Sequence, residues 1–261
     1  MAGPCSAQLQ GEAAAFTAAL RTLVNNPQFS PFPSMAHLGA PMEAGEHVPL
    51  APGLPFPSVA LHVHNVSCLQ ALEVLTSSVE YGLQDLCKLC IRFIKDTLSV
   101  EQVCEALQAA VTYGLADLQQ HCLAFIEGCT AAVVRTQGFH ELSDVVLARV
   151  LRSDRLAVDE LDLVQAVREW AHVSSAVLER PVPEVAALPV RELRLPLLAP
   201  NELATLESHN QRDLLIPVES IAAAWRAHAL RKGSGVPSHL CRPRRGTRPR
   251  DHHRHLDPHT K

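Results

Sequence analysis

Residues 75–94 read LTSSVEYGLQDLCKLCIRFI, and residues 107–126 read LQAAVTYGLADLQQHCLAFI. The second stretch copies the first at an offset of 32 residues, and the ten identical positions include both Tyr-Gly-Leu triplets. In each copy, apolar residues recur at intervals of three and four, which is typical of amphipathic helices. Glycine tolerates the left-handed conformation that follows a helix C-terminus, so each triplet predicts a turn between two helices. Two such hairpins are expected to stack and bury their apolar faces on one another.

More helices are needed to complete a core, and the sequence predicts them on both sides of the repeat. Asp85 and Asp117 fall in the first turn of the second helix of each copy, where a negative charge suits the helix dipole. Ser99 and Gln102 have the spacing of a capping box that would open the second copy. By similar criteria we predict helices over residues 8–26, from Asp144 to about Leu151 after a Ser143 cap, from an Asp159 cap to about Val177, from Asn201 to Glu207, and from Pro217 to Gly233.

The composition agrees with a mainly α-helical fold. Of the 261 residues, 47% are apolar and 19% are charged, which is enough for a buried core, whereas only 4% are aromatic. The longest run without charges, residues 47–72, contains prolines and histidines and is not predicted to span a membrane. Because no signal-peptide pattern is present, the eight cysteines are predicted to be reduced thiols in the cytoplasm or the nucleus.

Several stretches of the chain resemble one known family. Residues 75–94 resemble the last helices of a BTB/POZ domain, and residues 99–126 resemble the helices that follow it and open a BACK domain. Residues 151–170 resemble the centre of BACK, and residues 190–203 resemble its C-terminal signature. The resemblance to the BTB/POZ–BACK family covers residues 68–230 well. It implies a mainly α fold, with the stacked helical hairpins of a BACK domain preceded by a truncated BTB remnant.

The resemblance stops where the sheet of a BTB domain would lie. Residues 16–30 resemble the first BTB helix and the approach to its first strand, but a proline-rich stretch follows. One candidate strand, residues 59–66, cannot form a sheet by itself. An alternative transcript product and a faulty gene model would both explain the missing core. The expected organisation is an N-terminal helix in 1–30, an irregular Pro-rich segment in 31–66, BTB C-terminal helices in 67–98, a BACK domain in 99–232 and a disordered basic tail in 233–261.

The function implied by the resemblance is that of a non-enzymatic protein-interaction adaptor. The chain resembles the substrate adaptors of cullin-3 ubiquitin ligases, in which the BTB domain dimerises and helps to bind cullin-3. By resemblance, residues 96–110 and 115–126 would be the retained part of the cullin-contacting region. The substrate protein is unknown, and a monomer is expected because the BTB dimer interface is missing. Two alternatives stay open, namely a BACK-only binding module without ligase linkage and a truncated isoform without function.

Cys87 and Cys90 form the best candidate for a metal or redox site because of their Cys-x-x-Cys spacing. A zinc site needs four ligands, and no second pair stands at a suitable spacing. Cys90 and Cys122 occupy equivalent positions on the apolar face of the repeat, so both are predicted to be core residues. Cys87 and Cys104 are expected to be more exposed, although nothing nearby would lower the pKa of either thiol.

Other chemistry is not indicated. The sequence holds no phosphate loop, dinucleotide fingerprint, His-Glu-x-x-His or Gly-x-Ser-x-Gly motif, so no enzyme, cofactor or catalytic residue is predicted. A histidine-rich tail can bind a transition metal weakly without any function, and no metal site is predicted there. The tail histidines are His252, His253, His255 and His259.

The remaining candidates have plainer interpretations. Trp170 and Trp225 could anchor an interface, but their helical spacing with apolar neighbours predicts core residues. Asp159 and Glu160, at a helix start, are predicted to be cap and dipole partners rather than catalytic acids. Residues 231–261 hold nine Lys or Arg and two Asp or Glu, on a body of net negative charge. Such tails are more often solvated arms than nucleic-acid ligands, and nucleic-acid binding is not predicted.

Overall fold

The computed structural model describes residues 68–231 and 235–256. Within these residues the regular elements are all helices, which confirms the mainly α fold. They are α2 (Cys68–Glu80), α3 (Gln84–Thr97), α4 (Val103–Thr112), α5 (Ala116–Val133), α6 (Gln137–His140), α7 (Asp144–Leu151), α8 (Glu160–Leu178), α9 (Val182–Val185), η2 (Pro189–Glu192), η3 (Leu195–Leu197), α10 (Pro200–Asp213), α11 (Val218–Leu230), η4 (Ser238–Cys241) and α12 (His253–Leu256), where η marks a 3-10 helix. The helix predicted over residues 8–26, the Pro-rich segment and the candidate strand lie outside the described residues.

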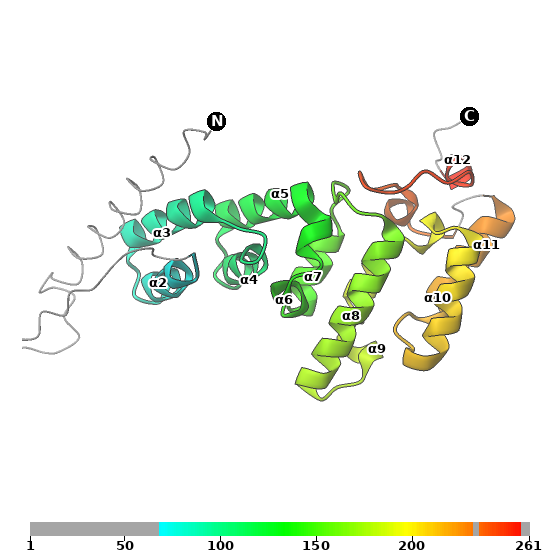
Figure 1. Cartoon of the computed structure of the whole chain (residues 1–261), viewed down its shortest axis with the longest axis horizontal. Coiled ribbons are helices and arrows are strands. Elements are labelled where there is room, and N and C mark those ends of the chain that lie inside the picture. Colours follow the sequence, from blue (N-terminus) through cyan, green and yellow to red (C-terminus); the bar gives the residue numbers. More distant parts are fainter. Residues whose placement is uncertain (1–67, 232–234, 257–261) are drawn as a thin grey trace, which may run out of the picture.

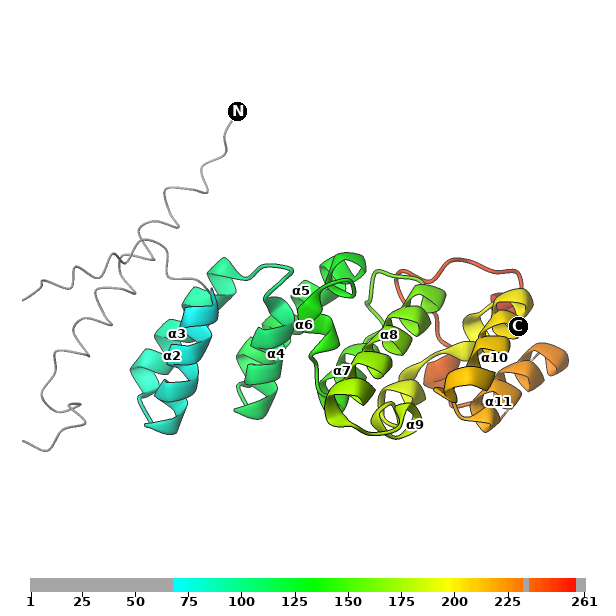
Figure 2. The same ribbon diagram turned by 60° about the horizontal axis from the view of Figure 1, so that its bottom comes forward.

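The helices form a row of antiparallel pairs. Figure 1 shows α2 and α3 at one end of the row and α10 and α11 at the other. Figure 2 shows the pairs one behind the next along the long axis, in chain order. This arrangement is the stack of helical hairpins that the repeat predicts.

The two repeated hairpins, α2–α3 and α4–α5, have the same turn. Gly82 and Gly114 both have a φ of +68°, which is the left-handed conformation expected at these positions. In the first turn, the Leu83 N–H donates to the Ser78 carbonyl at 2.8 Å, and the Gly82 N–H donates to the Val79 carbonyl at 3.2 Å. These two bonds define a Schellman motif, and the second turn repeats them at 2.8 and 3.3 Å. Identical triplets therefore make identical turns.

The hairpins share one apolar core with the helices that follow. Leu75 and Leu107, which are equivalent in the repeat, are both completely buried. Cys90 and Cys122 are also completely buried, so their prediction as core residues is confirmed. The same cluster continues without interruption through α7, α8, α10 and α11.

Two of the three predicted helix caps are confirmed. The Ser143 hydroxyl caps α7 and the Asp159 carboxylate caps α8, each accepting a backbone N–H of the first turn at 3.4 Å. The capping box predicted at Ser99 is wrong. The Ser99 hydroxyl donates instead to the side-chain oxygen of Gln102 at 2.9 Å, and α4 begins only at Val103, because Ser99 is taken up by a turn before the helix.

Helix α10 is longer than the short helix predicted over residues 201–207 and ends at Asp213. Its last turns are fixed by Asn210, which is buried. The Asn210 side chain donates to the Ile216 carbonyl and accepts from the Ile216 N–H, both at 2.8 Å. These two bonds hold the helix end against the loop before α11.

The chain after α11 corrects the prediction of a disordered tail. Residues 235–256, here called the C-terminal strap, contain η4 and α12 and run back along the body toward the loop between α7 and α8 (Figure 1). The Gly246 N–H donates to the Leu156 carbonyl at 2.9 Å. A Cβ atom at Gly246 would lie 2.0 Å from the Val158 backbone nitrogen, so the strap approaches the loop more closely than any side chain would permit. The sequence of the strap is rich in Arg and Pro and has no apolar periodicity. Its ordered structure could not be predicted from the sequence, because polar contacts hold the strap in place.

Candidate protein-interaction site

The cysteines do not form a reactive site. The seven cysteines within the described segments are free thiols. Cys87 is half-buried, whereas Cys90 points into the core, where burial raises the pKa of its thiol to about 12. Cys104 was expected to be exposed, and this is wrong, because it faces the hairpin core and is completely buried. Burial raises the pKa of the Cys104 thiol to about 12, so it stays protonated near neutral pH.

The ring nitrogens of two tail histidines, His252 and His253, lie next to backbone carbonyls. Among the residues that the structure describes, no group of three or more His, Cys, Asp or Glu side chains is placed to hold a metal ion. The Nε2 atom of His252 lies 3.1 Å from the Pro196 carbonyl, and that of His253 lies 2.8 Å from the Leu197 carbonyl. His259 lies outside the described residues.

Of the two tryptophans, only Trp170 is a full core residue. Trp170 is 2% exposed, as predicted, and its indole N–H donates to the Leu142 carbonyl at 2.8 Å. Trp225 is half-buried and packs against the edge of the core. Its indole N–H donates to the exposed Glu207 carboxylate at 3.0 Å.

Glu160 has a role that the sequence does not reveal. It is completely buried, and its carboxylate forms an ion pair at 2.9 Å with Arg244 of the strap, which is also completely buried. The other carboxylate oxygen accepts the backbone N–H of Arg194 at 2.6 Å. Both oxygens are therefore satisfied inside the protein, which makes a buried charge tolerable.

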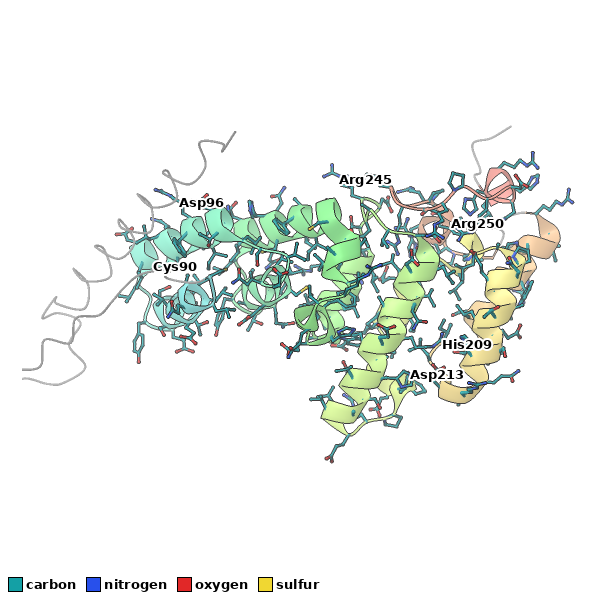
Figure 3. All side chains as sticks on the ribbon, viewed as in Figure 1. Cys90, Asp96, His209, Asp213, Arg245 and Arg250 are labelled. Carbon is teal, nitrogen blue, oxygen red and sulfur yellow. The ribbon has the colours of Figure 1, made fainter. Side chains whose placement is uncertain are left out.

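Asp159 caps α8 as predicted and also binds the strap. Its carboxylate accepts from the Arg250 guanidinium at 2.8 Å and from the Arg248 N–H at 2.7 Å. Burial opposes the charge of Asp159, but these donors outweigh it and hold the pKa of Asp159 below its usual range. Arg250 also reaches Glu202 at 2.8 Å. Figure 3 shows Arg245 and Arg250 above α8 and α10, along the path of the strap.

Three histidines lie together where the strap crosses η3. The ring centroids of His228 and His252 are 4.4 Å apart, and those of His252 and His253 are 4.6 Å apart. Their Nε2 atoms lie next to three consecutive carbonyls, of which the third, Leu198, is 3.0 Å from His228. Burial, followed by the charges that His228 and His253 would carry, lowers the pKa of His252 to about 4.

We expect the melting temperature to fall as the pH is lowered from about 6.5 toward 4. The unfolded chain binds a proton at His252 near its ordinary pKa of about 6.5, whereas the folded chain leaves this ring neutral until the pH approaches 4. Protons therefore favour the unfolded state across this window, and stability is lost as the pH falls. Circular dichroism melts of His252→Gln should show a weaker pH dependence than the unmodified chain, and an unchanged dependence would contradict the assignment.

An apolar opening lies beside the C-terminal half of α8. It is a cavity of about 490 Å³ between α8, α9 and the segment that joins α6 to α7. We call it the α8 groove. Its apolar lining consists of Leu142, Trp170, Val173, Val177, Leu178 and Val185.

Exposed apolar side chains gather at the α8 groove. Val173 is 42% exposed, Val177 is 75% exposed and Leu178 is 55% exposed. These are three of the ten exposed large hydrophobic residues in the described part of the chain. Their concentration at one opening is typical of a protein-interaction site.

Charged groups surround the apolar part of the groove. The lining contains three carboxylates, Glu141, Asp144 and Glu184, and one arginine, Arg180. Arg180 forms an ion pair with Glu184 at 2.5 Å, one turn further along the chain. The rim therefore carries net negative charge, supplied by Glu141 and Asp144.

A second, polar cavity of about 580 Å³ lies between α8 and α10, where Figure 3 shows His209 and Asp213. The Arg168 guanidinium donates to the Asp213 carboxylate at 2.7 Å. Burial opposes the charge of Asp213, but the Leu215 N–H and Arg168 hold the pKa of Asp213 below its usual range. Because this cavity is lined mainly by polar and charged side chains, the apolar α8 groove is the better candidate for a protein-interaction site.

The region that the resemblance assigns to cullin-3 lies toward the α2 end of the row, and one of its residues, Gln108, also lines the α8 groove. It comprises the end of α3, helix α4 and much of α5. Asp96, Glu101, Glu105 and Asp117 are exposed there. Lys95 and Asp117 join α3 to α5 by an ion pair of 2.5 Å. This surface is acidic, and Figure 3 shows Asp96 on it, far from Arg250.

No helix in residues 68–231 or 235–256 has both the length and the apolar character needed to cross a membrane.

Comparison with known proteins identifies the family. Residues 103–207 match the family described as BACK, BTB And C-terminal Kelch. BTB/POZ domain-containing protein 19 of Bos taurus is 50% identical over 280 residues, covering 95% of this chain and 96% of the relative. The protein of the same name from Homo sapiens is 48% identical over 290 residues, covering 97% and 98%. Both alignments are longer than this chain, so each relative carries residues without a counterpart here. With about half of its residues identical over nearly its whole length, the chain belongs to the BTB/POZ–BACK family, together with BTB/POZ domain-containing protein 19.

Proposed function

We propose that this chain is a non-enzymatic adaptor that brings a substrate protein to cullin-3, in the cytoplasm or the nucleus. Family membership supports a protein-interaction role. The observation that carries the proposal is the presence of two different surfaces on one row of helices. Exposed acidic side chains of α3, α4 and α5 lie toward the α2 end of the row (Figure 1), whereas the α8 groove is an apolar opening that borders α4 at Gln108. An adaptor needs two different surfaces of this kind.

The proposal includes a domain organisation. We propose that the BACK domain takes in residues 99–232 and is completed by the C-terminal strap. Residues 67–98 would be the BTB C-terminal helices that lead into it. The alignments exceed the chain in length, so both relatives carry residues that this chain lacks, as the loss of part of a BTB domain would produce. For this reason we also propose a monomer, which sedimentation can test.

The test is a calorimetric titration of the full chain with the N-terminal domain of cullin-3. We expect a micromolar or tighter Kd. Asp96→Lys should weaken binding at least about tenfold, because it reverses an exposed charge on the proposed surface. Glu219→Lys on α11, which is equally exposed but lies at the far end of the row, should leave binding unchanged. Binding that is absent, or that both variants weaken equally, would refute the link to cullin-3.

A BACK-only binding module without ligase linkage is the second candidate. Both relatives carry residues that this chain lacks. This candidate holds where those residues belong to the BTB domain, through which, by the resemblance, adaptors of this family bind cullin-3. This candidate predicts partner binding at the α8 groove and no heat with cullin-3. A truncated isoform without function predicts neither.

A further inference from the structure

We propose that the α8 groove binds a short amphipathic helix of a partner protein, with two or three large apolar side chains flanked by lysine or arginine. This inference rests on the proposed adaptor role, because it names the class of segment that the adaptor would recruit. It is carried by the juxtaposition of exposed apolar residues with a rim of net negative charge at one cavity.

The apolar part of the groove has the size and shape for a few side chains of a helix. Val173 and Val177 lie one turn apart on α8, and Leu178 follows directly. All three are exposed on a helix of 19 residues. A ridge with this spacing fits between side chains at i, i+3 and i+4 of a second helix. A volume of about 490 Å³ lies within the range of pockets that hold small ligands or a few anchoring side chains.

The groove is preformed, which favours binding. Trp170 lies beneath it and is fixed by its hydrogen bond to Leu142. Val185 of α9 is 4% exposed and closes the other side. Walls that are already packed lose little conformational freedom when a partner binds. A helix-in-groove mode also needs no free strand edge, and the described residues contain no strand.

The charge of the rim selects the partner. Glu141 accepts a hydrogen bond from the Gln137 side chain at 2.7 Å, and Asp144 accepts one from the Val145 N–H at 2.8 Å. These donors are neutral and add no positive charge. Arg180 pairs with Glu184 and also interacts electrostatically with Asp144, so one arginine faces three carboxylates and the rim keeps a net negative charge. Lysine or arginine beside the apolar anchors would supply the missing positive charge and set the orientation of the helix.

The probes are three designed helical peptides of equal length, labelled with fluorescein. The first carries leucines at i, i+4 and i+7 with lysines beside them, the second replaces the lysines by glutamates, and the third replaces the leucines by alanines. Fluorescence anisotropy with the full chain should show the first peptide binding at least about tenfold more tightly than the other two. Equal binding of the lysine and glutamate peptides would overturn the proposal, and so would a lack of binding by all three.

Variants locate the site. Val177→Ser with Leu178→Ser removes two exposed apolar side chains of the groove and should weaken the first peptide at least about tenfold. The matched control is Val218→Ser with Leu230→Ser, which removes two side chains on α11 that are 65% and 56% exposed. The control should bind the peptide normally, and equal losses in both pairs would overturn the assignment to α8. Thermal melts should show both pairs folded, because all four side chains are exposed.

A second variant tests the charge alone. Glu141→Gln with Asp144→Asn should reduce the preference for lysine over glutamate and keep the dependence on leucine. An unchanged lysine preference would show that the rim does not select the partner.

The cullin-3 titration separates this inference from the adaptor role. The Val177→Ser, Leu178→Ser variant should give the same heat with cullin-3 as the unmodified chain. A failure of all peptides with intact cullin-3 binding would refute the groove and leave the adaptor role standing. Peptide binding without cullin-3 binding would support the groove in a module without ligase linkage.

Discussion

Replacing Arg244 by methionine is expected to lower the free energy of unfolding by about 3–5 kcal/mol, because it breaks a buried ion pair by removing one partner. Glu160 would remain in the interior with a charge and without its cation. The same guanidinium donates to the backbone carbonyls of Leu151, Ser153 and Glu192. These carbonyls would also lose their donor, which adds to the cost.

Urea unfolding followed by circular dichroism measures this loss. Arg245→Met is the matched control, because Arg245 is the next residue and is exposed, and its side chain donates to the Glu127 carbonyl at 3.2 Å. It should change stability by less than about 1 kcal/mol. Arg244→Met combined with Glu160→Met should regain much of the loss, since no unpaired charge remains. A single Arg244 variant as stable as the control would contradict the role given to the pair.

Trp170→Ala is expected to lower the free energy of unfolding by about 3–5 kcal/mol. The change would leave a cavity beneath the α8 groove, because Trp170 is 2% exposed and is among the largest fully buried side chains of the described residues. The Leu142 carbonyl would also lose the indole donor.

Trp225→Ala provides the comparison for this prediction. Trp225 is half-buried, and its indole N–H donates to the exposed Glu207 carboxylate. Water can take the place of this hydrogen bond and can fill much of the space that the ring leaves. Its loss should cost less than half as much. Thermal melts of the two variants measured side by side test this difference. Equal destabilisation would contradict the prediction that Trp170 contributes more to the core than Trp225.

The repeated hairpins could be predicted because their determinants are local. Apolar spacing, a glycine after each helix and an aspartate in the next turn all lie within about twenty residues, and each acts through its own neighbours. Gly82 and Gly114 adopt the φ that this argument requires. The capping box at Ser99 failed because the same spacing also fits a turn that precedes a helix.

The strap and the groove could not be predicted in the same way. The bond between Arg244 and Glu160 joins residues 84 positions apart, and neither residue has a local pattern that marks it. The charge asymmetry between a basic tail and an acidic body was the available signal. Apolar residues such as Val173 and Val177 repeat with helical spacing whether they face the core or solvent, so periodicity alone did not separate the groove from the core.

The dependence of Glu160 on the strap has a consequence for synthesis. On the ribosome, Glu160 is made 84 residues before its partner Arg244. Until Arg244 has been made, helix α8 can form, but the Glu160 carboxylate at its start lacks the guanidinium with which it pairs in the interior. The body can therefore complete this buried pair only after the strap has been synthesised, and a chain that stops before Arg244 would leave Glu160 without that partner. Such an incompletely folded product would be a target for chaperones and proteases.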